Sequence, residues 1–274
     1  MSDQKNAAPA SSNAIALPAA TVVLLRAGSE APEILLVERA RSMGFAGGMY
    51  VFPGGKVDDG DLAIARNPKW TRGFEGLSDA DAAGRVASAR ETFEEAGVVL
   101  SEGPALDDAT RAEWRRRLNL ANDHDESKRY AEILEATGHV LSADALLPFS
   151  HWIPPLAHGV AKRFDTLFYI ARLPDGEVMT PDGREAVTAH WSTAAAALAR
   201  ADAGEIGVIF PTRRNLERLA QYPTVEALWS ATAARKLQLI QPEIVKRDDG
   251  MFLTIPTGAD YPITEEKMES AMRG

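Results

Sequence analysis

The sequence contains no cysteine among its 274 residues. Disulfide bonds, thiolate metal sites and cysteine nucleophiles are therefore excluded, and a reducing compartment fits the composition. Apolar runs near the roughly 20 residues that cross a bilayer are also missing. The stretch 1–18 is rich in Ala and Ser and lacks the basic start and long apolar segment of a signal peptide, so we expect a disordered leader. We therefore expect a cytoplasmic protein that does not enter a membrane.

Basic residues are few relative to acidic ones, with 30 Lys and Arg against 39 Asp and Glu and a net charge of −9. No block of Lys or Arg is present, so we expect no nucleic-acid partner. The composition, 45% hydrophobic and 25% charged, is that of an ordinary globular protein, and the length permits one large core. We expect a single domain over residues 19–274, and the sequence leaves a homodimer open.

Local patterns predict mixed strands and helices. Strands are expected in runs rich in β-branched and leucine residues at 21–27, 33–39, 49–52, 163–173, 186–191 and 251–256. Helices are expected at 79–97, 105–120, 125–137, 194–203 and 215–221. Elements in this order predict an α/β fold built on a mixed sheet.

The helix expected at 79–97 carries three closely spaced glutamates. Glu91, Glu94 and Glu95 fall within roughly a 100° arc of the helix. Carboxylates this close repel one another unless a cation lies between them, and such hard oxygen ligands suit Mg²⁺ or Mn²⁺. A solvated acidic helix face is the simpler alternative. The glycine-dense stretch 44–56 favours the metal site, because glycine lets the backbone approach a ligand closely.

Two segments together resemble the signature of the Nudix hydrolase family. That signature runs Gly, five residues, Glu, seven residues, then Arg-Glu-hydrophobic-any-Glu-Glu-any-Gly-hydrophobic. Residues 90–98, RETFEEAGV, are similar to its second half, with Thr92 at a hydrophobic place. Gly55 in Phe-Pro-Gly-Gly takes the place of the first glycine, and Asp61 stands where the family has Glu. The resemblance implies the Nudix fold, a mixed β-sheet sandwiched between helices.

The spacing between the two halves departs from the family. Asp61 and Arg90 are separated by 28 residues instead of seven, so 21 are inserted. Loop closure costs only about 0.6 kcal/mol per doubling of length, so we expect 62–82 to be a tolerated loop. The branch of the family that resembles the peroxisomal coenzyme A diphosphatase carries an insertion here, and residues 151–168 are similar to that branch as well. A second, helical insertion is expected near 103–145.

The resemblance implies metal-dependent hydrolysis of a diphosphate linkage in a nucleoside-diphosphate derivative, with Mg²⁺ or Mn²⁺ as cofactor. It assigns Glu91, Glu94, Glu95 and the backbone carbonyl of Gly55 as metal ligands. Arg90 joins the catalytic set; it lies four residues before Glu94 and is expected to hold one carboxylate in position. The general base is expected to be Glu91 or Glu185, because many members of the family recruit a later glutamate before a Trp-bearing strand.

The segment 35–55 is similar to the coenzyme A motif of Nudix diphosphatases. Arg39 and Gly48 fall in register, whereas Gly44 replaces the motif's second Arg, for which Arg41 is a nearby substitute. We expect a small-molecule substrate, coenzyme A or an acyl-coenzyme A. The residues expected to bind it are Arg39, Arg41, Gly54, Gly55 and Arg163.

Two other functions stay open at this point. One is hydrolysis of ADP-ribose or of a dinucleotide such as NADH. The other is a non-catalytic Nudix module that binds a nucleotide or a protein, which Asp61 and the interrupted signature favour. The three mutually repelling glutamates argue against the second, because a pure binding module does not need them.

Overall fold

The computed structural model describes residues 16–42, 46–120, 126–155 and 163–271. Within these ranges eight strands form a mixed sheet in the order β10-β7-β8-β1-β2-β3, with β4 also paired to β1 and β9 to β2. Its strands are β1 (Ala16–Arg26), β2 (Glu33–Arg39), β3 (Tyr50–Val51), β4 (Gly54–Lys56), β7 (Leu147–Trp152), β8 (Arg163–Arg172), β9 (Ala186–Thr193) and β10 (Leu239–Ile240). The sheet is mixed because β1 runs parallel to β8 and antiparallel to β2 and β4.

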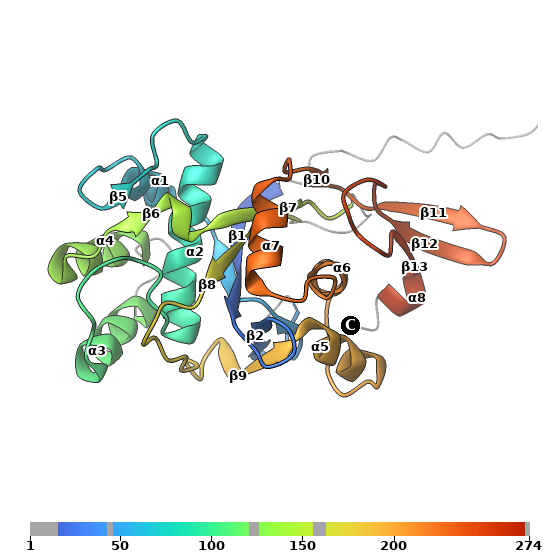
Figure 1. Ribbon diagram of the computed structural model, residues 1–274, viewed down its shortest axis with the longest axis horizontal. Helices are drawn as coiled ribbons and strands as arrows, with labels where there is room; N and C mark the ends of the chain where they lie inside the picture. Colours follow the sequence, from blue (N-terminus) through green and yellow to red (C-terminus); the bar gives the residue numbers. More distant parts are fainter. Residues whose placement is uncertain (1–15, 43–45, 121–125, 156–162, 272–274) are drawn as a thin grey trace, which may run out of the picture.

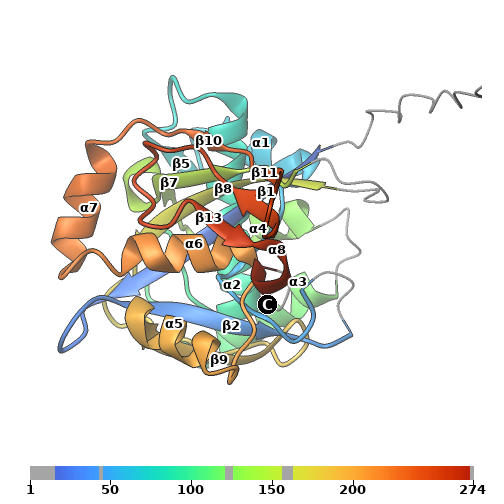
Figure 2. The ribbon, with the colours of Figure 1, turned by 90° about the vertical axis from the view of Figure 1, so that its right-hand side faces the viewer.

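Helices cover both faces of this sheet. They are α1 (Asp59–Ala65), α2 (Asp79–Ala96), α3 (Asp108–Asn119), α4 (Glu126–Thr137), α5 (Ala194–Asp202), α6 (Phe210–Leu219) and α7 (Val225–Ala233). Along β1, Val22 and Leu24 point into one core layer and Val23 and Leu25 into the other, as the alternation of a strand requires. The first layer is closed by α2 and the second by α5, α6 and α7 (Figures 1 and 2). The predicted α/β sandwich is confirmed.

The strands expected at 21–27, 33–39, 163–173, 186–191 and 251–256 are all present. The leader expected at 1–18 needs a correction at its end, because β1 begins at Ala16. Residues 16–18 pair with residues 163–165 of β8, so a neighbouring strand satisfies their backbone groups. Residues 1–15 and Gly44 lie outside the described residues.

The insertion at 62–82 is not a loop, and that interpretation was wrong. It contains most of α1, and a short strand, β5 (Thr71–Arg72), pairs in parallel with β6 (Leu141–Ser142) of the second insertion. Ile64 and Phe74 are each only 3% exposed and belong to the core layer beneath α2. Because apolar side chains from α1 and from the stretch after β5 are turned inward, the segment is part of the core rather than a surface addition.

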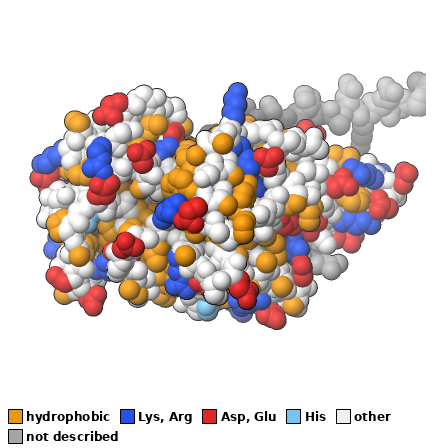
Figure 3. Space-filling view, viewed as in Figure 1, with side chains coloured by type: hydrophobic (Ala, Val, Ile, Leu, Met, Phe, Trp, Pro, Cys, Tyr) orange, Lys and Arg blue, Asp and Glu red, His pale blue; other side chains and the backbone are white. Residues whose placement is uncertain are grey.

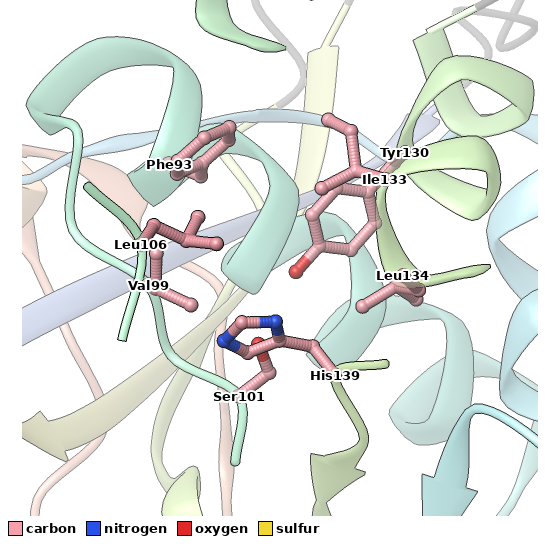
Figure 4. Close-up of a pocket in the computed structure, with 8 residues that line it drawn as sticks. All are labelled: Phe93, Val99, Ser101, Leu106, Tyr130, Ile133, Leu134 and His139. Atoms are coloured by element: carbon pink, nitrogen blue, oxygen red, sulfur yellow. The ribbon is translucent and has the colours of Figure 1, made fainter. Parts of the chain in front are cut away.

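The second insertion holds the two helices expected there, α3 and α4. Leu118 and Leu134 from these helices are buried against Phe93 of α2 and its neighbours in the same core layer. A cavity of about 10 Å³ remains between Phe93, Tyr130 and His139 (Figure 4). This volume is at the lower limit for one water molecule, so the insertion is packed and encloses no substrate pocket there.

The chain ends in a second, three-stranded sheet, β11 (Glu243–Arg247), β12 (Gly250–Thr254) and β13 (Glu265–Lys267), followed by α8 (Met268–Ala271). The helix expected at 215–221 begins five residues earlier, at Phe210, with Pro211 in its first turn, where proline is well tolerated. No helix in the described part of the chain is long and apolar enough to cross a bilayer. On the face drawn in Figure 3, acidic and basic side chains are interspersed.

Candidate active site

The glutamate-bearing helix α2 is fixed at both ends. Its N-terminus is capped by the Ser78 side chain, which accepts a hydrogen bond from the Asp81 N–H, and it ends at Gly97 with φ of 70°. Arg115 of α3 donates to the last carbonyls, those of Glu94 and Glu95. A cation at the C-terminus of a helix stabilises its dipole, so the second insertion helps to hold the end of α2.

The glycine turn lies directly against this helix. The Gly54 N–H donates to Oε2 of Glu95 at 3.0 Å, and Gly54 and Gly55 pair with β1. A Cβ atom on Gly55 would stand 2.3 Å from Oε1 of Glu91, and one on Gly54 would stand 2.4 Å from the Ala20 carbonyl oxygen. Gly54, which faces backbone atoms, therefore requires glycine, whereas a side chain at Gly55 would displace the Glu91 carboxylate. The fold thus brings the two halves of the interrupted signature into contact.

Arg90 is completely buried and organises the carboxylates around it. Its Nη1 lies 2.8 Å from Oε1 of Glu91 and 2.9 Å from Oε2 of Glu126. Its Nε and Nη2 bind the two oxygens of Asp61, at 3.3 and 3.1 Å. Among the glutamates of α2, the carboxylate that Arg90 holds is that of Glu91, and Glu94 is half-buried.

Two members of this network, Asp61 and Glu126, were not among the residues predicted for the site. Asp61 is completely buried and also closes the first turn of α1, because its Oδ2 accepts from the Asp58 N–H at 2.8 Å. Its shorter side chain is compatible with a bidentate pair to Arg90. Glu126 begins α4, in the second insertion, and nothing in its local sequence marks it as a site residue.

The glutamates of α2 lie in an unfavourable environment for negative charge. Burial raises the pKa of Glu95 well above its usual range and raises the pKa of Glu91 as well. Burial, followed by the charges of Glu91 and Glu126, raises the pKa of Glu94 to about 8. The charge of Glu185 adds to the shift of all three pKa values, which places this carboxylate near the cluster.

The donor chemistry of this cluster fits a hard divalent cation, because it gathers carboxylate oxygens whose mutual repulsion such an ion would relieve. In the described part of the chain, no three acidic or histidine side chains surround a common point in the way a bound ion requires. Glu91 is turned toward Arg90 and Glu95 toward the Gly54 N–H. Each of these carboxylates uses one oxygen in that contact, and a carboxylate held through one oxygen can bind a metal ion through the other.

Arg39 and Glu185 approach the cluster from the sheet. Nη1 of Arg39, at the end of β2, lies 3.8 Å from Oε1 of Glu95. Its Nε is buried and has no hydrogen-bond partner among the described residues. Glu185 is exposed in the loop before β9, and its carbonyl accepts from the Ala40 N–H at 2.9 Å, which ties this loop to the end of β2.

The remaining two predicted substrate residues lie farther out. Arg41 is exposed in the turn after β2, beside Gly48. Arg163 begins β8 and donates to the Pro154 carbonyl. It pairs with Ala16 of β1, whereas Gly55 pairs with Ala20, four residues farther along the same strand. At about 3.3 Å per strand residue, this places the Arg163 backbone roughly 13 Å along the sheet from the glycine turn.

Comparison with known proteins agrees with this geometry. The NUDT19 Nudix domain family matches residues 75–219. The chain is 27% identical to the human acyl-coenzyme A diphosphatase NUDT19, over 89% of this chain and 76% of that protein. The Xenopus laevis protein of the same name is 25% identical, over 84% of this chain and 71% of that protein.

A solved structure extends the similarity to three dimensions. The crystal structure of a Nudix hydrolase from Alicyclobacillus acidocaldarius superposes with a TM-score of 0.68 and 27% identity, covering 80% of this chain and 97% of that one. The matched family covers more than half of the chain, and the glycine turn and glutamate helix of its signature are in contact here. The chain therefore belongs to the Nudix hydrolase family, in the branch of the NUDT19 Nudix domain.

Proposed function

We propose that this Nudix hydrolase cleaves the diphosphate linkage of coenzyme A or of an acyl-coenzyme A, with Mg²⁺ or Mn²⁺ as cofactor. The observation that carries the proposal is the contact of Glu91 and Glu95 with the glycine turn, with Arg39 beside Glu95. The human and Xenopus laevis relatives, both named acyl-coenzyme A diphosphatase, support the choice of substrate.

Each residue of the cluster has a role in this proposal. Glu91, Glu94, Glu95 and the Gly55 carbonyl would hold the cation. When bound, such an ion neutralises the diphosphate oxygens and lowers the pKa of a coordinated water molecule. Arg90 acts through Glu91 and is a positioning residue.

The remaining roles concern the substrate and the attacking water. The buried Nε of Arg39, which lacks a partner among the described residues, is suited to a diphosphate oxygen. Glu185 is exposed beside the cluster and is proposed to accept a proton from the attacking water, with Glu91 as the alternative base. Gly54 and Gly55 let the diphosphate approach the backbone, and Arg41 and Arg163 are proposed for more distant phosphates of the substrate.

We further propose a cytoplasmic location, a possible homodimer and a single domain for this protein, as the sequence led us to expect. A cytoplasmic location is tested by cell fractionation with antibody detection. A homodimer is tested by light scattering on the purified protein. A single cooperative domain over residues 19–274 is tested by coincident unfolding transitions in fluorescence and circular dichroism.

The decisive experiment separates the products by ion-exchange chromatography. Coenzyme A, an acyl-coenzyme A, ADP-ribose and NADH are each incubated with the enzyme and Mg²⁺ or Mn²⁺. We expect coenzyme A and the acyl-coenzyme A to give 3′,5′-ADP and a phosphopantetheine product. We also expect their kcat/KM values to exceed those of ADP-ribose and NADH. Preference for ADP-ribose or NADH would overturn the substrate class, and an undiminished rate in excess EDTA would overturn the metal requirement.

A further inference from the structure

A second cavity lies on the other side of the sheet from α2. It has a volume of about 30 Å³ and is lined by Phe149 of β7, Arg218 of α6, and three residues that follow α7, Arg235, Lys236 and Gln238. Phe149 points into the core layer closed by α5, α6 and α7, so the central sheet separates this cavity from the glutamates of α2 (Figure 2).

Arg218 is the most unusual residue of this cavity. It is only 2% exposed, and its guanidinium carbon lies 4.4 Å from the ring centre of Phe149 and 5.2 Å from that of Tyr261. In the described part of the chain it forms no ion pair, and its Nε and Nη2 have no hydrogen-bond acceptor. Its Nη1 makes a weak contact with the Tyr261 hydroxyl, at 3.5 Å. A buried guanidinium without an acceptor is costly, so an external anion would stabilise it.

Two further cations surround the same space. Arg235 donates from Nε to Asp260 at 2.7 Å and from Nη2 to the Tyr222 hydroxyl at 2.9 Å, but its buried Nη1 has no acceptor among the described residues. Lys236 is exposed at the rim. Among the described residues, the three cations that line the cavity and Asp260, which pairs with Arg235, together carry a formal charge of +2.

We propose that this cavity is a binding site for a phosphate group, separate from the site on α2. The adjacent Nε and Nη2 of Arg218 form the fork that binds two oxygens of one anion. Nη1 of Arg235 and the Lys236 ammonium add donors from the side. A phosphate monoester carries a charge of about −1.5 to −2 at pH 7, which matches the +2 of the cavity better than a carboxylate does. Inorganic phosphate and the terminal phosphate of a larger monoester share this chemistry.

The test uses the metal-free enzyme in EDTA, so that binding at the glutamates of α2 is minimised. Inorganic phosphate and glycerol 2-phosphate are titrated by calorimetry and by thermal shift, at constant ionic strength set with chloride. The variants are R218M, R235M and K236M. The matched controls are K246M, which removes an exposed lysine of β11, and R39M, which removes the arginine beside Glu95.

We expect saturable binding of one phosphate by the parent protein, K246M and R39M. K236M should weaken it roughly two- to fivefold, as for an exposed charge, and R235M and R218M by about thirtyfold or more. Tighter binding of glycerol 2-phosphate than of phosphate identifies a monoester as the ligand, and the reverse identifies free phosphate. Absence of saturable binding, unchanged affinity in both R235M and K236M, or loss of binding in R39M would overturn the proposal. If R218M does not fold, the other two variants decide.

Discussion

Nη1 of Arg90 lies 2.9 Å from Oε2 of Glu126 and 2.8 Å from Oε1 of Glu91, so one buried nitrogen joins the second insertion to the glutamate helix. Glu126 therefore shares the positioning of Glu91 although it lies 36 residues from Arg90 in the sequence. The insertion is part of the architecture of the site.

Replacement of Glu126 by Gln should lower kcat by about tenfold with little change in KM, because Arg90 would then draw Glu91 more strongly toward itself. Steady-state kinetics with coenzyme A measure both constants. E132Q, on the same helix and paired with the nearby Arg129, is the control and should behave as the parent protein. Equal kinetics of E126Q and E132Q would show that Glu126 has a purely structural role.

Glu95→Gln should leave the protein folded and lower kcat by about 100-fold or more, because it removes a ligand charge at nearly constant shape. Circular dichroism confirms the fold, and product release from coenzyme A under saturating Mg²⁺ gives the rate. E75Q changes an exposed glutamate and should have the activity of the parent. Near-parent turnover by E95Q would contradict the assignment of the site.

Glu185→Gln tests the proposed general base. Loss of a positioned base typically lowers a rate by about 10²- to 10⁴-fold, and we expect this loss in kcat with metal affinity unchanged. Mn²⁺ titrations followed by electron paramagnetic resonance measure that affinity separately. E30Q, in an exposed turn, is the control. If the E185Q rate equals that of E30Q, Glu91 becomes the candidate base.

Phe74→Ala tests the insertion at 62–82. Truncation of a buried phenylalanine costs about 3–5 kcal/mol of the free energy of unfolding, and Phe74 is 3% exposed beneath α2. Urea denaturation should show this loss, whereas E75A, at the exposed neighbouring residue, should change the free energy little. A loss below about 1 kcal/mol would restore the interpretation of this segment as a surface loop.

Glu217 predicts a pH dependence of stability outside the active site. Burial raises its pKa from the ordinary 4.5 to about 7, against the opposing charges of Arg214 and Arg213. Between these two pH values the folded protein binds more protons at this carboxyl than the unfolded protein does. Its contribution to stability is therefore fully present below about pH 4.5 and is lost as the pH rises through 7.

The measurement compares the parent with Glu217→Gln by urea denaturation at pH 5, 6, 7 and 8. The difference in the free energy of unfolding, parent minus variant, should decrease as the pH rises from 5 to 8. The altered contact with Arg214 adds to this difference a constant that does not vary with pH. E269Q, which changes an exposed glutamate of α8, should give a difference that does not vary with pH. A flat difference for E217Q would contradict the raised pKa.

The sequence by itself determined the elements whose signals are local. The helix expected at 79–97 and the arc of its three glutamates depend on residues of one segment, so the local pattern predicts them, and the structure has this helix with caps at Ser78 and Gly97. The strands β1, β2 and β8 are likewise marked by their own β-branched and leucine residues. The resemblance to the family signature further predicted that these glutamates would meet the glycine turn, a segment distant in the sequence.

Only the tertiary structure decided the partners of Arg90 and the status of the insertion. Asp61 and Glu126 reach Arg90 from 29 and 36 residues away, through two separate helices, and no local periodicity records such a meeting. Phe74 is buried, and Trp70 partly buried, because they pack in the core layer closed by α2, which their own sequence neighbours do not reveal. Local signals depend on neighbours within a turn or two, whereas these contacts depend on where the chain returns, which packing of the whole core determines.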